Sequence, residues 1–217
     1  MIISLTGFMG CGKSSVGRRL STLLSCSYTD LDAVIEETDG RSIPEIFAAD
    51  GEGAFRTLEA ECLQRFISSQ QDRELEQSLP SQAMAARRKS PLGCLPIARD
   101  LCGQRGSTVP APYPAGTKVA ILALGGGTVM TPECAEMVHE NTICIYLRAS
   151  VDTLVNHLEG ETQGRPMLES GISLRERIYE LMERRSSTYE KTSHIIIDTD
   201  GKEVYEICHE ILESLSN

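Results

Sequence analysis

The chain has 217 residues and a formal net charge of −10, with 31 Asp and Glu against 21 Lys and Arg. This length allows one domain with a substantial core, and the acidic balance argues against nucleic acid as a partner, because phosphate backbones bind basic surfaces. The eight cysteines are scattered without a C-x-x-C pair, which is typical of free thiols rather than of disulfides or a zinc site. The start of the sequence has no secretory signal pattern, and no apolar run is long enough to cross a membrane, so we expect a soluble, cytoplasmic protein.

The motif G-F-M-G-C-G-K-S-S at Gly7–Ser15 follows the short apolar run Ile2–Leu5. It fits the phosphate-loop pattern G-x-x-x-x-G-K-[ST], in the order strand, glycine turn, helix. The glycines let backbone N–H groups form an anion site, and the helix that begins at Lys13 adds its positive end. A chance glycine turn is the alternative, but its position after an N-terminal strand favours a triphosphate site. We predict a nucleotide-binding set of Gly10, Cys11, Gly12, Lys13, Ser14 and Ser15, with Lys13 on the β- and γ-phosphates and Ser14 on Mg²⁺.

A helix and a short strand follow this loop. Apolar residues at helical spacing predict a helix over Lys13–Leu24, and Ser27–Thr29 is typical of a strand. The strand delivers Asp30 and Asp32 at its C-terminal end. One carboxylate near Mg²⁺ and one facing a substrate hydroxyl suit phosphoryl transfer to an alcohol. An Asp-x-Asp pair can also simply cap a turn, but beside a phosphate loop we favour the functional interpretation.

The next two predicted helices are separated by a glycine break. Ser42–Glu45 forms a capping box with a first-turn proline, which predicts a short helix through Ala49. After Gly51–Gly53, an apolar stripe predicts a longer helix from Ala54 to about Ser69. Arg56 lies in the first turn of that helix, where a cation opposes the helix dipole. It is therefore either a plain surface residue or a residue kept for binding.

Residues 72–117 differ in character from the rest of the chain. They contain six prolines and the basic cluster Arg87–Lys89, without a sustained period. We interpret them as an insertion that is loop-like or partly disordered, with one or two short helical turns. Because the insertion precedes a strand, we expect it at the edge of the sheet opposite the active site, as a tolerated surface segment; a partner-binding role is the alternative.

The remaining sequence alternates strands and helices. We predict strands at Val119–Leu124, Ile143–Leu147 and Ile195–Ile197, and helices that begin after Thr131, Ser150 and Ser173 and near Val204. The strands are continuous apolar runs, which is typical of strands buried on both faces. The whole chain, 1–217, therefore predicts a single α/β domain with a three-layer P-loop NTPase fold: a five-stranded parallel sheet with helices on both faces.

In such sheets, ligands bind beyond the C-terminal ends of the strands. The phosphate loop, Asp30–Asp32 and Gly125–Gly127 each follow a strand, so we expect them at one edge. Gly125–Gly127 offers three backbone N–H groups to a ligand, unless it is a plain turn. Residues 160–172 resemble a mobile lid that brings Arg165 to the transferring phosphate. The four histidines form no metal pattern, and we expect His157 and His194 to be structural.

Taken together, these motifs resemble those of the shikimate kinase family of phosphate-loop enzymes. The resemblance covers almost the whole chain apart from residues 72–117, and its specificity comes from seven motifs in the family's order. They are Gly7–Ser14, Asp30-Leu31-Asp32, Phe55-Arg56-Thr57-Leu58-Glu59, Leu124–Thr128, Tyr146–Ser150, Gly164-Arg165-Pro166-Met167-Leu168 and Arg185-Ser186-Ser187-Thr188-Tyr189.

The resemblance implies an acceptor site for shikimate. Asp32 would bind the shikimate hydroxyls and act as the base for the 3-hydroxyl. Arg56 and Arg185 would hold the carboxylate with their planar guanidinium groups, and Gly126 would offer its N–H to the same substrate. Glu59, one helical turn after Arg56, could orient that arginine.

On the donor side, the resemblance implies that Ser14 ligates Mg²⁺ with Asp30 acting through water, and that Arg165 joins Lys13 and Asp32 as a catalytic residue. Two positions depart from the family pattern. Cys11 replaces a smaller or hydroxyl residue, and we expect its side chain to point away with little effect. Lys202 stands where the family has an adenine-side arginine, and we assign it to the nucleotide site.

We therefore expect a shikimate kinase that uses ATP and Mg²⁺ to form shikimate 3-phosphate and ADP, as in aromatic amino-acid biosynthesis. Its partners would be ATP/ADP and shikimate, with no nucleic acid and no membrane, and we expect a monomer. A gluconate kinase of the same fold is one alternative. A phosphate-loop paralogue that binds nucleotide without turnover is another, although Asp30, Asp32 and Arg165 argue against it.

Overall fold

The computed structural model describes residues 1–78, 119–159 and 173–216, and it describes side chains up to Asp72 in the first of these ranges. Within them, a single sheet has the strand order β2-β3-β1-β4-β5, and every neighbouring pair is parallel. The five strands are β1 (Ile2–Thr6), β2 (Ser27–Asp30), β3 (Ala120–Ala123), β4 (Ile143–Arg148) and β5 (Ile195–Asp198).

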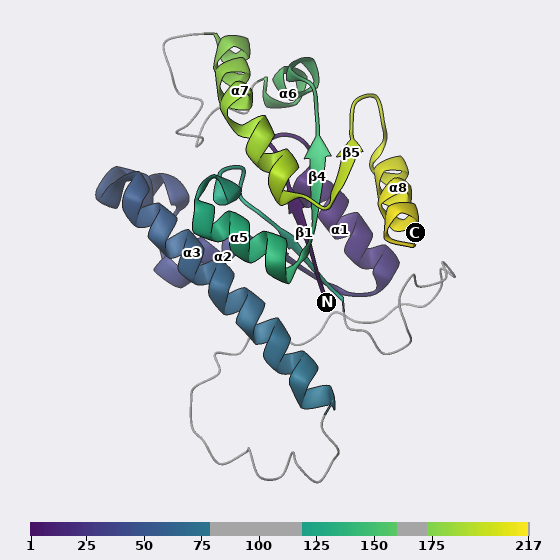
Figure 1. Cartoon of the computed structure of the whole chain (residues 1–217). Coiled ribbons are helices and arrows are strands. Elements are labelled where there is room, and N and C mark those ends of the chain that lie inside the picture. Colours follow the sequence, from purple (N-terminus) through teal and green to yellow (C-terminus); the bar gives the residue numbers. More distant parts are fainter. Residues whose placement is uncertain (79–118, 160–172, 217) are drawn as a thin grey trace.

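Helices cover both faces of this sheet (Figure 1). Helices α1 and α8 pack on one face, whereas α2, α3 and α5 pack on the other, and α7 contributes to both hydrophobic clusters. The helices are α1 (Lys13–Leu24), α2 (Leu31–Asp39), α3 (Ile43–Ser78), α5 (Pro132–Asn141), α6 (Val151–Leu158), α7 (Leu174–Thr192) and α8 (Val204–Ser216), with a short 3-10 helix η1 (Thr128–Met130). None of these described helices combines the length and apolar character needed to span a membrane.

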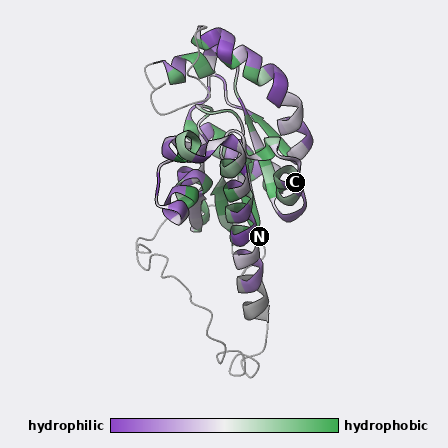
Figure 2. Ribbon diagram, turned by 90° about the vertical axis from the view of Figure 1, so that its left-hand side faces the viewer, coloured by the Kyte–Doolittle hydropathy of each residue, from purple (hydrophilic) through white to green (hydrophobic). Residues whose placement is uncertain are grey.

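The central strands are apolar because both of their faces are covered. Every residue of β1 and β3 is buried, as expected for a parallel sheet between two helical layers. Alternate residues serve opposite layers: Ile3 and Leu5 pack in the cluster with α1 and α8, whereas Ile2 packs in the cluster with α3 and α5. Figure 2 shows the hydrophobic strands enclosed by helices with hydrophilic outer faces. The predicted three-layer fold is confirmed.

Several predicted helix boundaries are also confirmed. Helix α1 has the predicted bounds, and Ser173 forms both halves of a capping box with Glu176 at the start of α7. The break predicted at Gly51–Gly53 is a kink inside α3, where Gly51 has a φ of 80° and a ψ of 175°. A left-handed φ of this kind favours glycine. The kink sets the direction of the helix that carries Arg56.

Two helical segments were not predicted. Helix α2 begins directly at the exit of β2, where the Asp30 side chain caps it by accepting a hydrogen bond from the Asp32 N–H. Helix α3 continues to Ser78, beyond the predicted end near Ser69 and into the expected insertion, for which one or two short helical turns were predicted. Residues 72–78 include Arg, Glu, Leu and Gln, which are strong helix formers but provide no apolar stripe. The rest of the expected insertion (79–117) and the expected lid (160–172) lie outside the described residues.

His194 links the start of β5 to the start of β4. The ring Nδ1 of His194 accepts a hydrogen bond from the Cys144 backbone N–H at 3.0 Å, and the backbone N–H of His194 donates to the Cys144 carbonyl at 2.8 Å. Its ring stacks on His139, with 4.5 Å between centroids and an interplanar angle of 6°. The predicted structural role of His194 is confirmed.

This arrangement predicts an acid-sensitive contact. Burial and the neighbouring His139 lower the pKa of His194 below its ordinary value of 6.5. The unfolded chain therefore binds the proton more readily, so the free energy of unfolding should fall as the pH drops below about 6.5. We expect His194→Gln to lose less stability than the wild type between pH 7.5 and pH 5.5, measured by urea unfolding. His209→Gln, at an exposed histidine 3.3 Å from Glu213, should not reduce this loss; an unchanged loss in His194→Gln would contradict the prediction.

Candidate active site

A cavity of about 880 Å³ lies at the C-terminal edge of the sheet. The phosphate loop after β1 forms its centre, because β1 lies in the middle of the sheet. Asp32, Arg56 and Gly126 line the end toward β2 and β3, whereas Thr199 and Lys202 line the end toward β5. The expected convergence of the strand exits on one edge is therefore observed, and the volume suits small ligands.

The phosphate loop has the conformation that its glycines permit. Gly10 and Gly12 have φ values of 83° and 91°, which L-residues with a Cβ rarely adopt. Gly12 is the N-cap of α1, so the loop ends on the positive end of this helix. The Lys13 ammonium donates to the carbonyls of Gly7 and Phe8, at 3.0 Å each, and therefore lies across the loop. This is an anion site with a positive charge held over it.

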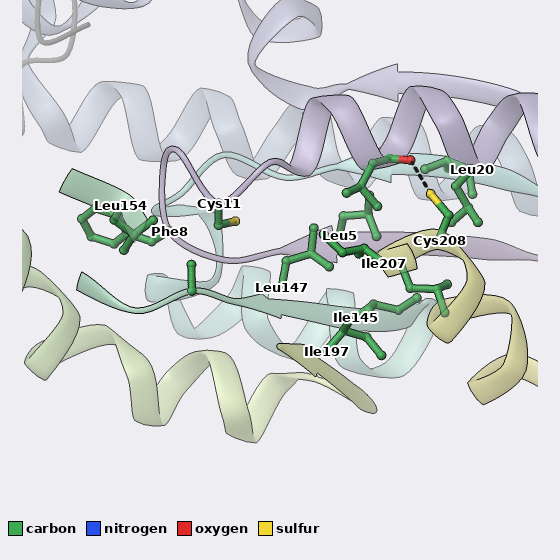
Figure 3. Close-up of a cluster of buried hydrophobic side chains, with 14 of the residues drawn as sticks. Leu5, Phe8, Cys11, Leu20, Ile145, Leu147, Leu154, Ile197, Ile207 and Cys208 are labelled. Carbon is green, nitrogen blue, oxygen red and sulfur yellow. Dashed lines mark hydrogen bonds between the residues drawn. The ribbon is translucent and has the colours of Figure 1, made fainter. Parts of the chain in front are cut away.

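Cys11 lies in this loop, but its side chain belongs to the core. It is 3% exposed, and Figure 3 shows it near Phe8 and Leu147 in the cluster beneath the loop. The expectation that it points away from the ligand side is confirmed.

Ser14 and Asp30 come together beside the loop. The Ser14 hydroxyl donates to Asp30 Oδ2 at 3.2 Å, and the Tyr28 hydroxyl donates to the same oxygen at 3.1 Å. A hydroxyl and a carboxylate are ligands that Mg²⁺ accepts, usually together with waters and substrate phosphates. The described residues contain no cluster of three or more His, Cys, Asp or Glu side chains that could hold a metal alone. The donor set therefore fits a magnesium ion that is shared with a nucleotide.

Asp32 lies in the first turn of α2 and faces the glycine turn after β3. A Cβ on Gly125 would lie 2.6 Å from Asp32 Oδ1, so the two residues are in close contact. Burial raises the pKa of Asp32 to about 6; the carboxylate of Asp30 adds to the rise, and the Lys13 ammonium opposes it. A partly buried carboxylate with a pKa near neutrality is suited to accept a proton.

Arg56 is held by carboxylates at the start of the second part of α3. Its Nη1 donates to Glu59 Oε2 at 2.7 Å and its Nη2 to Glu52 Oε1 at 3.2 Å. Glu59 is 1% exposed, and its other oxygen accepts a hydrogen bond from the Thr128 hydroxyl at 2.6 Å. The expected contact between Glu59 and Arg56 is confirmed. Gly127 leaves room for the guanidinium, because a Cβ there would lie 2.5 Å from Arg56 Nη2.

Arg185 reaches the same glycine turn from α7. Its Nη1 donates to the Gly126 carbonyl at 3.3 Å, and its guanidinium lies 5.9 Å from the centre of the Phe8 ring. The side chain is buried, yet it lines the cavity. Asp32, Arg56, Gly126 and Arg185, which the family resemblance groups at one acceptor site, all line this cavity. Together they combine two guanidinium groups with one carboxylate, a set suited to a ligand that carries both a carboxylate and hydroxyls.

The family model for shikimate kinase matches residues 9–73 and 115–216, which is well over half of the chain. The chain belongs to the shikimate kinase family. Shikimate kinases from Dictyoglomus turgidum and Thermus thermophilus are 31% and 32% identical to it. Both matches cover 98% of this chain, with 96% and 89% of the relatives' lengths.

Solved structures of shikimate kinases agree with this fold. That from Acinetobacter baumannii, in complex with shikimate, has a TM-score of 0.73 at 24% identity and covers 99% of this chain and 92% of its own. That from Bacteroides thetaiotaomicron has a TM-score of 0.70 at 21% identity and covers 100% and 99%. The likeness establishes the P-loop NTPase fold expected for the shikimate kinase family.

Of two further residues assigned from the family resemblance, Arg165 and Lys202, the structure describes only Lys202. Arg165 lies outside the described residues. Lys202 lines the cavity at the end toward β5, where its ammonium pairs with Glu210 at 2.7 Å.

The structure also brings to the site residues that sequence reasoning missed. His157, which we expected to be structural, lines the cavity, and its Nδ1 lies 2.8 Å from the Gly10 carbonyl. Tyr189 donates from its hydroxyl to the Gly126 carbonyl. Its spacing of four residues after Arg185 places both on one face of a helix, which is the signal that could have pointed to it.

Proposed function

We propose that this protein is a shikimate kinase that transfers the γ-phosphoryl group of ATP to the 3-hydroxyl of shikimate, a step of aromatic amino-acid biosynthesis. The observation that carries the proposal is the position of two guanidinium groups, Arg56 and Arg185, at the Asp32 end of a cavity whose centre is the phosphate loop. The loop selects a nucleotide donor, and the arginines select an acidic acceptor.

At the acceptor end, Arg56 and Arg185 bind the shikimate carboxylate through charge-assisted hydrogen bonds. The Gly126 N–H binds a ring hydroxyl. These contacts fix the acceptor relative to the donor, and holding two reactants in a near-attack geometry supplies a large part of the rate. Glu59 supports the arrangement, since it holds Arg56 from a buried position.

Asp32 is the general base. The 3-hydroxyl oxygen forms a bond to the γ-phosphorus, the bond from that phosphorus to the bridging oxygen of ADP breaks, and the hydroxyl proton passes to Asp32. A pKa of about 6 keeps this carboxylate largely ionised at neutral pH, while raising its basicity above that of an ordinary Asp.

On the donor side, Lys13 neutralises charge on the β- and γ-phosphates, and the loop N–H groups of Gly10, Cys11, Gly12, Ser14 and Ser15 bind phosphate oxygens. Ser14 would hold Mg²⁺ directly and Asp30 through water; when bound, this ion neutralises charge on the phosphates.

Two further assignments complete the nucleotide site. We assign Arg165 to the transferring phosphate, on a lid at 160–172, and Lys202 to the adenine side. We also propose that the protein is a monomer. We further propose that the protein acts in the cytoplasm, where ATP is available.

A coupled assay of ADP release tests the proposed function. Purified, folded protein is given ATP and Mg²⁺ with shikimate, with gluconate, or with no acceptor. We expect turnover that depends on shikimate, and a phosphorylated product that can be confirmed by ³¹P NMR. Turnover with gluconate alone would identify a different small-molecule kinase, and nucleotide binding without turnover would indicate a silent paralogue. Either result would overturn the proposal.

A further inference from the structure

The carbonyl of Gly126 accepts two hydrogen bonds from α7. One comes from the Tyr189 hydroxyl and the other from Arg185 Nη1 at 3.3 Å. Tyr189 is completely buried, and its ring stacks on Tyr146 with 5.1 Å between the centroids. Because packing fixes the Tyr189 ring, its hydroxyl group has one defined position. The carbonyl is therefore held by a rigid donor and by an arginine that we assign to substrate.

The peptide on the other side of Gly126 is held as well. The Gly125 carbonyl accepts a hydrogen bond from the Thr128 N–H at 3.2 Å, inside the turn that leads into η1. Both peptide planes that flank the Gly126 Cα therefore have a fixed partner. The Gly126 N–H itself makes no hydrogen bond to another residue that the structure describes, and Gly126 lines the cavity.

Such restraint is needed at this position. Three successive glycines can adopt many backbone conformations, and each conformation directs their N–H groups differently. A side chain cannot restrict this turn from within. A Cβ would lie 2.6 Å from Asp32 Oδ1 at Gly125, 3.2 Å from the Met9 N atom at Gly126 and 2.5 Å from Arg56 Nη2 at Gly127. The restraint must therefore come from outside the turn.

We propose that Tyr189 is a positioning residue for the acceptor: its hydroxyl fixes the Gly126 carbonyl and thereby aims the Gly126 N–H and the Arg185 guanidinium at shikimate. This inference rests on the proposed function. Arg185 and Tyr189 are four residues apart and meet at one carbonyl, so the helix, the turn and the carboxylate-binding arginine form one unit. A hydroxyl placed only to satisfy a buried tyrosine would stabilise the fold without affecting the acceptor.

Tyr189→Phe separates these roles because it removes the hydroxyl and keeps the ring. Net hydrogen-bond contributions correspond to about a 3- to 10-fold effect. We expect the KM for shikimate to rise about 3- to 10-fold, with the KM for ATP unchanged and kcat reduced less than KM rises. Tyr179→Phe is the control, since it removes an exposed hydroxyl from the same helix and should change none of these values.

A second measurement does not depend on turnover. In ligand-free protein labelled with ¹⁵N-glycine, Tyr189→Phe should shift or broaden the amide signals of Gly126 and Gly127, whereas Tyr179→Phe should not. Unchanged glycine signals, or equal changes in the KM values for shikimate and ATP, would overturn the positioning role. Absence of shikimate-dependent turnover in the wild type would instead overturn the proposed function, and the inference with it.

Discussion

Asp32→Asn is expected to lower kcat by about 10²- to 10⁴-fold while leaving ADP binding unchanged. The substitution keeps the size of the side chain but removes the carboxylate that accepts the hydroxyl proton, and general bases contribute about this much to rate. Nucleotide binding should survive because the phosphate loop and Lys13 are untouched. Steady-state kinetics and calorimetric titration with ADP measure the two properties separately. Glu37→Gln, an exposed carboxylate on the same helix, is the matched control, and a near-wild-type rate in Asp32→Asn would remove Asp32 as the base.

The pH dependence of the wild type gives an independent check on the same residue. Burial raises the pKa of Asp32 to about 6, so kcat/KM should fall as the pH drops through about 6 and the carboxylate becomes protonated. This acid limb should be absent from the residual activity of Asp32→Asn. A wild-type profile without an inflection near pH 6 would contradict the assignment.

The same raised pKa has a cost in stability. Because the folded-state pKa of about 6 lies above the ordinary value of 3.8, stability falls as the pH rises from about 4 to about 6, and the full loss remains at higher pH. Asp32→Asn should therefore have a higher Tm than the wild type at pH 7.5, and the difference should vanish below about pH 4. The base is thus retained at the expense of stability, as often happens at functional sites.

The sheet could be predicted because its signals are local. Apolar runs such as Val119–Leu124 and Ile143–Leu147 indicate strands buried on both faces, and the phosphate-loop spacing identifies the first strand and helix. The helix α2 and the extension of α3 to Ser78 could not be predicted in this way. The first is short and begins at a residue that also resembles a turn cap, and the second has no apolar face, so neither carries a periodic signal.

The candidate site shows a similar division. The rule that ligands bind at strand exits points to Asp32 and Gly126, whereas Arg56 and Arg185, which lie on helices, come only from the family resemblance. The contacts that hold these residues could not be predicted from spacing alone, apart from the Glu59–Arg56 pair. The hydrogen bond from Thr128 to Glu59 joins residues 69 positions apart, and that from Tyr189 to Gly126 joins residues 63 apart. Such partners depend on how distant elements pack.

The contact between Gly125 and Asp32 leads to the second large expected effect. Gly125→Ala should lower kcat by about 10²-fold, because the new Cβ would lie 2.6 Å from Asp32 Oδ1 and must displace the base. A displacement of about 1 Å from the reactive geometry can have this effect. The same Cβ would lie 3.0 Å from the Thr128 hydroxyl and 3.2 Å from Glu59 Oε1, so it should also weaken the bond that supports Arg56 and raise the KM for shikimate.

Stability separates this effect from simple misfolding. The three atoms nearest to the added Cβ are side-chain oxygens, which can move without breaking the turn, so Gly125→Ala should still fold cooperatively, with a Tm that is lower only by the few degrees expected for a weakened buried hydrogen bond. Gly53→Ala is the matched control, because a Cβ there meets nothing within 4 Å and alanine favours the helix; it should leave kcat unchanged. A wild-type kcat in Gly125→Ala would mean that the structure accommodates the added Cβ without displacing the Asp32 carboxylate. The close packing of Asp32 against the glycine turn would then have no part in positioning the base.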